Sequence, residues 1–380
     1  MRTHQPNANP TSSYSDRHAR LAEALNTAGI DALVLNPCPS LTYLTGLHFH
    51  LMERPIAVIF VPGQPLTIIL PELETAKVNA LSFPVQTFTF NDDPATWQDV
   101  YRHAVHATQI ENSRIGVEPT RFRVLELRFL ETAAPHAQIV SAESAVASLR
   151  MCKDATEISA MRKAVDIAQH ALHATIPLIR IGMTEQDIAA ELVLQLLRAG
   201  THADMPFTPI VSGGPNSANP HAFPSRRKIA SGDFLVIDWG ASFGGYISDL
   251  TRTFAIGKVE PELMKIYEAV KQANAAGRAT GHPGILAGDV DRAARAVIES
   301  AGYGKYFTHR TGHGIGMEGH EEPYMHAGNP LRLAPGMAFT VEPGIYLPDY
   351  NGVRIEDDVV VTAEGAECLS DFTRELITIG

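Results

Sequence analysis

The sequence predicts two domains, an α/β domain followed by an α+β domain with an internal repeat. The chain has 380 residues, of which 45% are hydrophobic, which is enough for a large core and more than one domain. In the N-terminal part, helical and strand-like segments alternate, as is typical of α/β domains. In the C-terminal part, the order helix, helix, hairpin occurs twice. The repeat predicts two related halves that meet at a shared site.

The first domain is expected over residues 16–150, after a polar, proline-bearing segment that we expect to be a flexible tail over residues 1–15. An amphipathic pattern from Asp16 predicts a helix that leads into a short strand. The segment 36–55 suggests a loop and a strand. Further strands are expected at 56–61, 66–71 and 114–119, and a further helix near 121–132.

The second domain is expected over residues 151–380. Its first helix begins at about Lys153, and its second at Thr184, whose hydroxyl can cap the helix with Asp187 at the third helical position. A hairpin follows these two helices. The second set consists of helices at 260–277 and 289–301 and a second hairpin.

The first hairpin, residues 234–254, contains two aspartates. An apolar run reaches a glycine-rich turn, and a second alternating run returns. With Phe243 and Gly244 as a two-residue loop, Asp238 lies opposite Asp249, with Cβ atoms roughly 5 Å apart. Like charges placed opposite each other destabilise a sheet unless a cation lies between them.

The second hairpin repeats this arrangement with glutamates. Residues 338–347 and 352–362 flank a turn, in a register that places Glu342 opposite Glu356. A single acidic pair would more simply be a solvated face. However, Asp238 and Glu342 directly follow strongly apolar strand residues, where an uncompensated charge is costly. Two such pairs therefore favour bound cations.

A histidine completes the predicted site. His313 lies among glycines, which let the backbone come close to a ligand. Four carboxylates and one imidazole suit hard or borderline divalent ions, and four negative charges balance two dications. The absence of cysteine from the set argues against a structural zinc site. The sequence thus predicts a dinuclear metal site for metal-assisted hydrolysis, with the ligands Asp238, Asp249, His313, Glu342 and Glu356.

Five sequence blocks between residues 212 and 358 resemble the pita-bread metallopeptidase family, which includes methionine aminopeptidase, aminopeptidase P and prolidase. They are SGGPNSANPHAFPS, DWGASFGGYISDLTRTF, HRTGHGIGMEGHEEP, TVEPGIY and GVRIEDD, in the family's order. The resemblance implies the pita-bread (creatinase/aminopeptidase) fold, with a pseudo-twofold repeat, for residues 151–380. The segment 36–55 resembles the creatinase/prolidase N-terminal domain, which methionine aminopeptidases usually lack. It favours the proline-specific branch.

The resemblance also implies a role for each site residue. It makes the same five residues metal ligands, with Asp249 and Glu356 contacting both ions. The implied catalytic residues are His221, His320 and Glu342, and the implied substrate-binding residues are His221, His309, His320 and Arg354. Glu342 would take a proton from the attacking water, and Arg354 would hold a ligand carboxylate or a substrate carboxylate. The structural alternatives are solvated or hydrogen-bonded histidines, and an arginine paired with an acidic neighbour.

The implied activity is that of an Xaa-Pro aminopeptidase or Xaa-Pro dipeptidase, which cleaves the bond between an N-terminal residue and proline by attack of a metal-bridging hydroxide. Two divalent ions are expected, Mn²⁺ first, with Co²⁺ or Zn²⁺ able to substitute. The substrates would be short peptides with proline in the second position, and the enzyme a homodimer. Two alternatives stay open: a metal-dependent hydrolase of another small amide, and a noncatalytic binding module on the same fold.

Composition excludes several other classes of protein. The net charge of −11 disfavours binding to nucleic acid, and no apolar run approaches the roughly 18 residues that span a bilayer. The three cysteines are odd in number and widely spread, which fits a reducing compartment. No signal peptide pattern begins the sequence. We therefore expect a cytoplasmic location, with neither a membrane nor nucleic acid as a partner.

Overall fold

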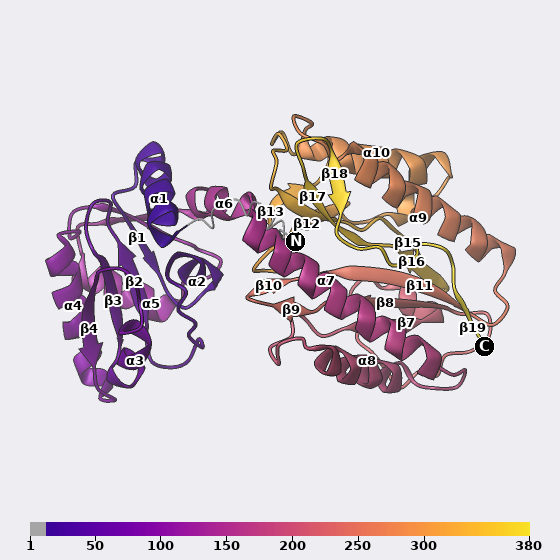
Figure 1. Ribbon diagram of the computed structural model, residues 1–380, viewed down its shortest axis with the longest axis horizontal. Coiled ribbons are helices and arrows are strands. Elements are labelled where there is room, and N and C mark those ends of the chain that lie inside the picture. The colour runs from indigo at the N-terminus through magenta and orange to yellow at the C-terminus, as the bar shows by residue number, and fades with distance from the viewer. Residues whose placement is uncertain (1–12) are drawn as a thin grey trace, which may run out of the picture. The chain divides into compact units, whose positions relative to one another are not determined.

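The computed structural model describes residues 13–380, which form two compact units, one ending at Arg150 and one running from Met151 to Gly380 (Figure 1). Helix α1 (Tyr14–Ala28) begins before the predicted start at Asp16. The Ser13 side chain accepts a hydrogen bond from the Asp16 N–H, and the Asp16 carboxylate accepts one from the Ser13 N–H. This capping box extends the helix, so the predicted tail is wrong for Tyr14 and Ser15. Residues 1–12 of that tail lie outside the described residues.

The N-terminal unit contains a six-stranded sheet with the order β4-β3-β2-β1-β5-β6. Strand β2 pairs antiparallel with β1 and β3, and the other pairs are parallel. The strands are β1 (Ala32–Leu35), β2 (Ala57–Phe60), β3 (Leu66–Pro71), β4 (Val85–Phe90), β5 (Arg114–Val117) and β6 (Gln138–Ser141). The remaining helices are α2 (Pro39–Thr45), α3 (Thr75–Val78), α4 (Trp97–Thr108), α5 (Val124–Ala133) and α6 (Glu143–Met151). The predicted strands at 56–61, 66–71 and 114–119 are confirmed.

The segment 36–55 differs from the loop and strand expected there, because it contains helix α2. Pro39 occupies the first helical position, where its missing N–H has no cost, and the Cys38 sulfur accepts from the Leu41 N–H. Gly46 ends the helix in the left-handed region, with φ +72°. The first part of the segment is therefore a short helix.

The C-terminal unit repeats the order helix, helix, hairpin, as predicted. The first half contains α7 (Ala155–Thr175), α8 (Glu185–Ala199), β7 (Ile210–Gly213), β8 (Phe234–Trp239), β9 (Ser242–Phe243), β10 (Tyr246–Ile247) and β11 (Leu250–Ile256). The second half contains α9 (Pro261–Thr280), α10 (Ala287–Ser300), β12 (Gly312–Gly314), β13 (Glu321–Met325), β14 (Ala338–Val341), β15 (Gly344–Leu347), β16 (Asn351–Arg354), β17 (Asp357–Val361), β18 (Ala366–Cys368) and β19 (Thr378–Ile379). The predicted capping box of Thr184 and Asp187 starts α8.

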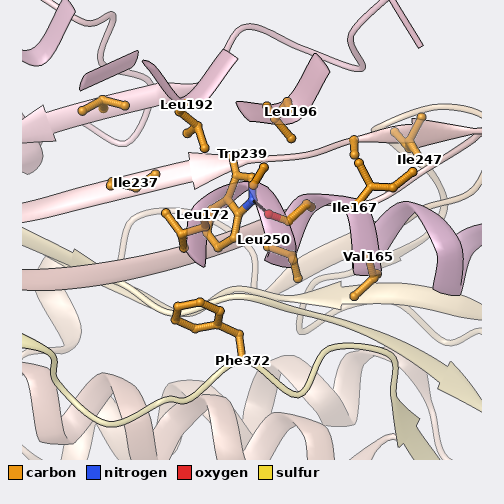
Figure 2. Close-up of a cluster of buried hydrophobic side chains, with 14 of the residues drawn as sticks. Val165, Ile167, Leu172, Leu192, Leu196, Ile237, Trp239, Ile247, Leu250 and Phe372 are labelled. Atoms are coloured by element: carbon orange, nitrogen blue, oxygen red, sulfur yellow. Dashed lines mark hydrogen bonds between the residues drawn. The ribbon is translucent and has the colours of Figure 1, made fainter. Parts of the chain in front are cut away.

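The main sheets have the orders β19-β11-β8-β7 and β13-β12-β14-β17-β18. Figure 1 shows their strands between α8 on one side and α9 and α10 on the other. Trp239 anchors β8 in the core beneath α7, where its indole N–H donates to the Ala168 carbonyl at 2.8 Å. Figure 2 shows this side chain among Leu172, Leu250 and Phe372. Because neighbouring strand residues point to opposite faces, Asp238 points away from this core.

The register of the first hairpin differs from the predicted one by two residues. Asp238 pairs with Thr251, and Phe243 pairs with Tyr246. The turn residues are therefore Gly244 and Gly245, with φ +60° and +83°. A two-residue turn of this kind needs positive φ at both positions, which the predicted Phe243-Gly244 loop would have imposed on phenylalanine. Asp249 is thus a diagonal neighbour of Asp238 on the same face, and the predicted direct opposition is wrong.

The register of the second hairpin is confirmed on both sides of its glutamates. Val341 pairs with Asp357, and Gly344 pairs with Arg354. Glu342 and Glu356 lie between these two ladders, where the strands separate. The Glu356 N–H instead donates to the Thr251 carbonyl of the first hairpin at 3.1 Å. This bond joins the two hairpins at the predicted acidic residues.

No helix within residues 13–380 is both long and apolar enough to span a bilayer.

Candidate active site

A cavity of about 630 Å³ in the C-terminal unit brings together every predicted site residue. Its acidic side chains come from the two hairpins, and His313 comes from β12. Apolar side chains of Pro206, Phe207 and Ile210 form part of its wall. The predicted residues that line it are His221, Asp238, Asp249, His309, His313, His320, Glu342, Arg354 and Glu356.

His313 presents one ring nitrogen to the carboxylates. Its Nε2 lies 3.2 Å from Glu342 Oε1 and 3.9 Å from Asp249 Oδ2. Its Nδ1 lies 3.1 Å from the Gly314 carbonyl, to which it donates. Metal-binding histidines typically donate their second N–H in this way. Single ligand atoms of Asp249, His313 and Glu356 lie within 4.8 Å of one another, so these three residues form a candidate metal cluster.

The acidic cluster is electrostatically incomplete without cations. Burial raises the pKa of Asp249 and of Glu356 well above the usual range, and neighbouring carboxylates raise both further. Burial also raises the pKa of Asp238, whereas the Arg354 charge lowers it. Asp238 Oδ1 is buried without a hydrogen-bond partner among the described residues. Buried polar atoms are rarely left unpaired, so this oxygen and the repelling carboxylates fit bound divalent cations.

Glu342 differs from the other acidic residues. Burial alone would raise the pKa of its carboxyl, but the hydrogen bond and charge of His313 outweigh burial and lower that pKa to about 2. Thr340 Oγ1 also donates to Glu342 Oε1 at 3.3 Å. Glu342 therefore stays ionised at neutral pH, whereas burial and repulsion favour the protonated forms of Asp249 and Glu356.

Arg354 pairs with an acidic residue of the site. Its Nη2 lies 2.5 Å from Asp238 Oδ2, and its Nε donates to Thr251 Oγ1 at 3.1 Å. The Thr251 hydroxyl in turn donates to Glu356 Oε2 at 2.6 Å. Of the two roles considered for Arg354, the geometry matches the one in which it holds a carboxylate of the metal cluster. Thr251 was missed because the wrong register placed Asp249 in its position.

Tyr346 is a second residue that sequence reasoning missed. Its hydroxyl oxygen accepts from Arg354 Nη1 at 3.0 Å and lies 2.9 Å from His309 Nε2. His309 Nδ1 lies 2.7 Å from the Arg310 carbonyl, to which it donates, so Nε2 accepts from the Tyr346 hydroxyl. Burial raises the pKa of Tyr346 to about 12 and lowers the pKa of His309. The register of the second hairpin places Tyr346 diagonally across from Arg354, so this register could have identified Tyr346 as a site residue.

We expect Tyr346→Phe to lower kcat/KM about fivefold, because the variant loses the hydroxyl that bonds both Arg354 and His309, at a net cost of roughly 1 kcal/mol. Metal content should not change, since Arg354 keeps its direct bond to Asp238. Steady-state kinetics and metal analysis of the purified variant measure both quantities. Tyr350→Phe is the matched control, because that hydroxyl bonds the exposed Glu260. Loss of metal from Tyr346→Phe would contradict this interpretation.

His320 and His221 enter the cavity from loops. The His320 ring lies 3.9 Å from the His313 ring, centroid to centroid, and its Nδ1 lies 3.4 Å from Arg310 Nη2. Because arginine only donates, Nδ1 accepts and the Nε2–H remains available. Burial, followed by the His313 charge, lowers the pKa of His320 to about 4. His221 is exposed, on a loop that follows the 3₁₀ helix Gly214–Ala218.

Two buried ionic groups support the segments that carry the site. Lys153 Nζ lies 2.5 Å from Glu321 Oε1, next to His320, and these side chains are only 1% and 9% exposed. Asp357, next to Glu356, pairs with Arg252 at 2.8 Å and with Arg374 at 2.7 Å. Arg252 also donates to the carbonyl groups of Thr251, Glu356, Phe372 and Thr373.

An acidic cluster with one histidine, enclosed in a cavity and short of positive charge, defines a metal-dependent hydrolase. The chain belongs to metallopeptidase family M24, whose model matches residues 159–363, and it is a metallopeptidase. The creatinase/prolidase N-terminal domain matches residues 17–152. Both the predicted family and the predicted fold class are therefore confirmed.

Three relatives match nearly the whole chain. The Xaa-Pro dipeptidase of Pyrococcus horikoshii is 33% identical over 96% of this chain and 99% of its own length. The structure of the dipeptidase PepE from Mycobacterium ulcerans has a TM-score of 0.88 and 37% identity, over 98% of this chain and 100% of that one. The structure of a prolidase from Thermococcus sibiricus has a TM-score of 0.91 and 34% identity, over 97% of this chain and 100% of that one.

Proposed function

We propose that this protein hydrolyses the bond between an N-terminal residue and a following proline, as an Xaa-Pro dipeptidase or Xaa-Pro aminopeptidase. The observation that carries the proposal is the single cavity that collects the five acidic and imidazole residues together with His221, His309, His320 and Arg354. The names of the Pyrococcus and Thermococcus relatives support proline as the second residue of the substrate. A homodimer and a cytoplasmic location remain predictions from the sequence.

We assign two divalent ions to the site, with Mn²⁺ as the expected metal, held by Asp238, Asp249, His313, Glu342 and Glu356. When bound, they supply Lewis acidity to the scissile carbonyl and lower the pKa of a water molecule toward neutrality. Four carboxylates match the charge of two dications, which would relieve the repulsion that raises the pKa of Asp249 and Glu356.

The side chains of the protein carry out the remaining steps. Glu342, which lies 3.2 Å from His313 Nε2 at the centre of the acidic cluster, accepts the proton of the attacking water and passes it to the leaving proline nitrogen. His320 directs its Nε2–H at the oxygen of the scissile carbonyl, where negative charge develops. Arg354, which also donates to the Tyr346 hydroxyl, holds Asp238 in place. His221 and His309 contact the substrate on either side of the imide, which has no N–H of its own.

Hydrolysis of Ala-Pro, Ala-Pro-Ala, Met-Ala-Ser and a set of non-proline amides tests this proposal, on metal-stripped protein before and after Mn²⁺ is added back. We expect cleavage of the Xaa-Pro substrates alone, and only with metal. Cleavage of Met-Ala-Ser at a similar rate would remove proline from the proposal. A protein that binds metal but cleaves no peptide would be a hydrolase of another small amide or a binding module.

A further inference from the structure

Glu185, the first residue of α8, carries a buried carboxylate that bonds both ends of one loop. The residue is 0% exposed, and its carboxylate oxygens accept hydrogen bonds from the segment 213–225. The donors are the Gly213 N–H at 2.7 Å, the Asn216 side-chain amide at 3.0 and 3.1 Å, the Ser225 N–H at 2.9 Å and the Ser225 hydroxyl at 2.6 Å. A buried carboxylate is costly unless such bonds replace its hydration. Glu185 therefore holds the beginning and the end of this loop together.

The same loop carries His221 at the active-site cavity. His221 lies between Asn216 and Ser225 in sequence, and it lines the cavity. Its backbone N–H donates to Asn219 Oδ1 at 3.1 Å, whereas its ring has no hydrogen-bond partner within residues 13–380. The nearby Phe223 is 82% exposed, so this side chain does not pack the loop against the domain. The position of the His221 ring is therefore set by the backbone of the loop.

The first turn of α8 adds two backbone bonds to one end of the loop. The Glu185 N–H donates to the Arg227 carbonyl at 3.0 Å, and the Gln186 N–H donates to the Ser225 carbonyl at 3.1 Å. The first N–H groups of a helix have no partner inside the helix, and the helix dipole favours a carboxylate at this end. The helix backbone thus fixes the end at Ser225, and the Glu185 side chain connects that end to the start of the loop at Gly213.

We propose that Glu185 is a positioning residue of the active site, which holds the loop 213–225 so that His221 reaches the substrate. The inference rests on the proposed function, because Glu185 acts on the reaction through the contact of His221 with the substrate. The isosteric change Glu185→Gln replaces one acceptor oxygen with an NH₂ donor that faces the donors of the loop. A displacement of about 1 Å at a group that contacts the substrate can lower the rate by up to about 100-fold. The effect of this change is therefore large enough to measure.

The first test is a double-mutant cycle of Glu185→Gln and His221→Ala, measured on Ala-Pro with Mn²⁺. For Glu185→Gln alone we expect kcat/KM to fall about tenfold. In protein that already carries His221→Ala, the same change should lower kcat/KM less than about twofold, because the side chain that Glu185 positions is gone. Equal losses in both backgrounds would overturn the inference, because they would show that Glu185 supports the fold and not His221. A wild type that cleaves no Xaa-Pro peptide would overturn the proposed function, and the role of His221 with it.

The second test measures the loop itself and needs no substrate. The N–H groups of Gly213 and Ser225 donate to Glu185, so their protection from hydrogen exchange reports on the anchor. We expect exchange in the segment 213–225 to be at least about tenfold faster in Glu185→Gln than in the wild type, with exchange in β8 unchanged. Mass spectrometry of peptides from the two proteins measures both rates.

Two further variants complete the design. Ser225→Ala removes one hydroxyl donor to Glu185 and keeps the Ser225 backbone, so it should give smaller changes in exchange and in kcat/KM, and it tests the inference even if Glu185→Gln does not fold. Glu191→Gln is the matched control, because its carboxylate bonds Gln195 within α8, and it should change neither quantity. Unchanged loop exchange in both Glu185→Gln and Ser225→Ala would overturn the inference, while the proposed function would stand.

Discussion

Replacing Asp249 with alanine is expected to remove bound metal and to lower peptidase activity by at least about a thousandfold. The loss is large because the side chain contributes one of three closely spaced ligand atoms in the cluster with His313 and Glu356. The fold should persist, because the local backbone contact is made by the Asp249 N–H, which donates to Asp358 Oδ2 at 3.0 Å. Metal analysis and kinetics with added Mn²⁺ measure the two losses. Full turnover by this variant would disprove the dinuclear site.

In the metal-free protein, Asp249→Ala is expected to make the stability of the fold less dependent on pH. Burial and repulsion raise the pKa of Asp249 and Glu356 above their ordinary values of 3.8 and 4.5. Carboxyl groups with a raised folded-state pKa stabilise the fold at acidic pH, and this contribution is lost as pH rises above the ordinary values. In EDTA, the wild type should therefore lose stability between about pH 4 and neutrality, and Asp249→Ala should lose less. Thermal unfolding at several pH values in EDTA measures this difference, and identical pH profiles would contradict it.

Glu342→Gln is expected to lower kcat by about 10²- to 10⁴-fold, with a smaller change in KM. Glutamine keeps the size of the side chain and can still accept the hydrogen bond from Thr340, but it cannot take a proton from water. Kinetics at saturating Mn²⁺, together with metal content, measure the effect. Glu299→Gln on the exposed surface of α10 is the control. Full recovery of activity at high Mn²⁺ would show that Glu342 only binds metal.

Features that depend on local chemistry were predictable from the sequence. The capping box at Thr184 needs only Thr184 and Asp187, and both the sequence and the structure contain it. In the glutamate hairpin, the strand pairs on either side of Glu342 and Glu356 follow the single register that the sequence predicted. The aspartate hairpin was harder, because adjacent glycines allow two loops. The sign of φ decides between those loops, because a Phe243-Gly244 loop would require a positive φ at phenylalanine.

Residues that act through distant contacts were not predictable in the same way. The metal-site candidates were visible because carboxylate and imidazole groups are rare in apolar strands. Lys153, by contrast, meets Glu321 across 168 residues of sequence, and no periodicity connects them. Arg310 lies in the histidine-rich block 309–320, where no local pattern marks it as a residue of the cavity. Its neighbour Tyr324 faces it only because β13 returns beside β12.

The two buried ionic groups also determine how much of the chain an autonomous catalytic fragment needs. The family model ends at residue 363 and begins at residue 159, whereas Lys153 and Arg374 lie beyond these limits. A fragment cut at the family boundaries would leave Glu321 without Lys153, and Asp357, the neighbour of Glu356, without Arg374. Removing one partner of a buried pair costs about 3–5 kcal/mol, a large fraction of the stability of a domain. A catalytic fragment must therefore extend at least from Lys153 to Arg374 to keep both groups paired.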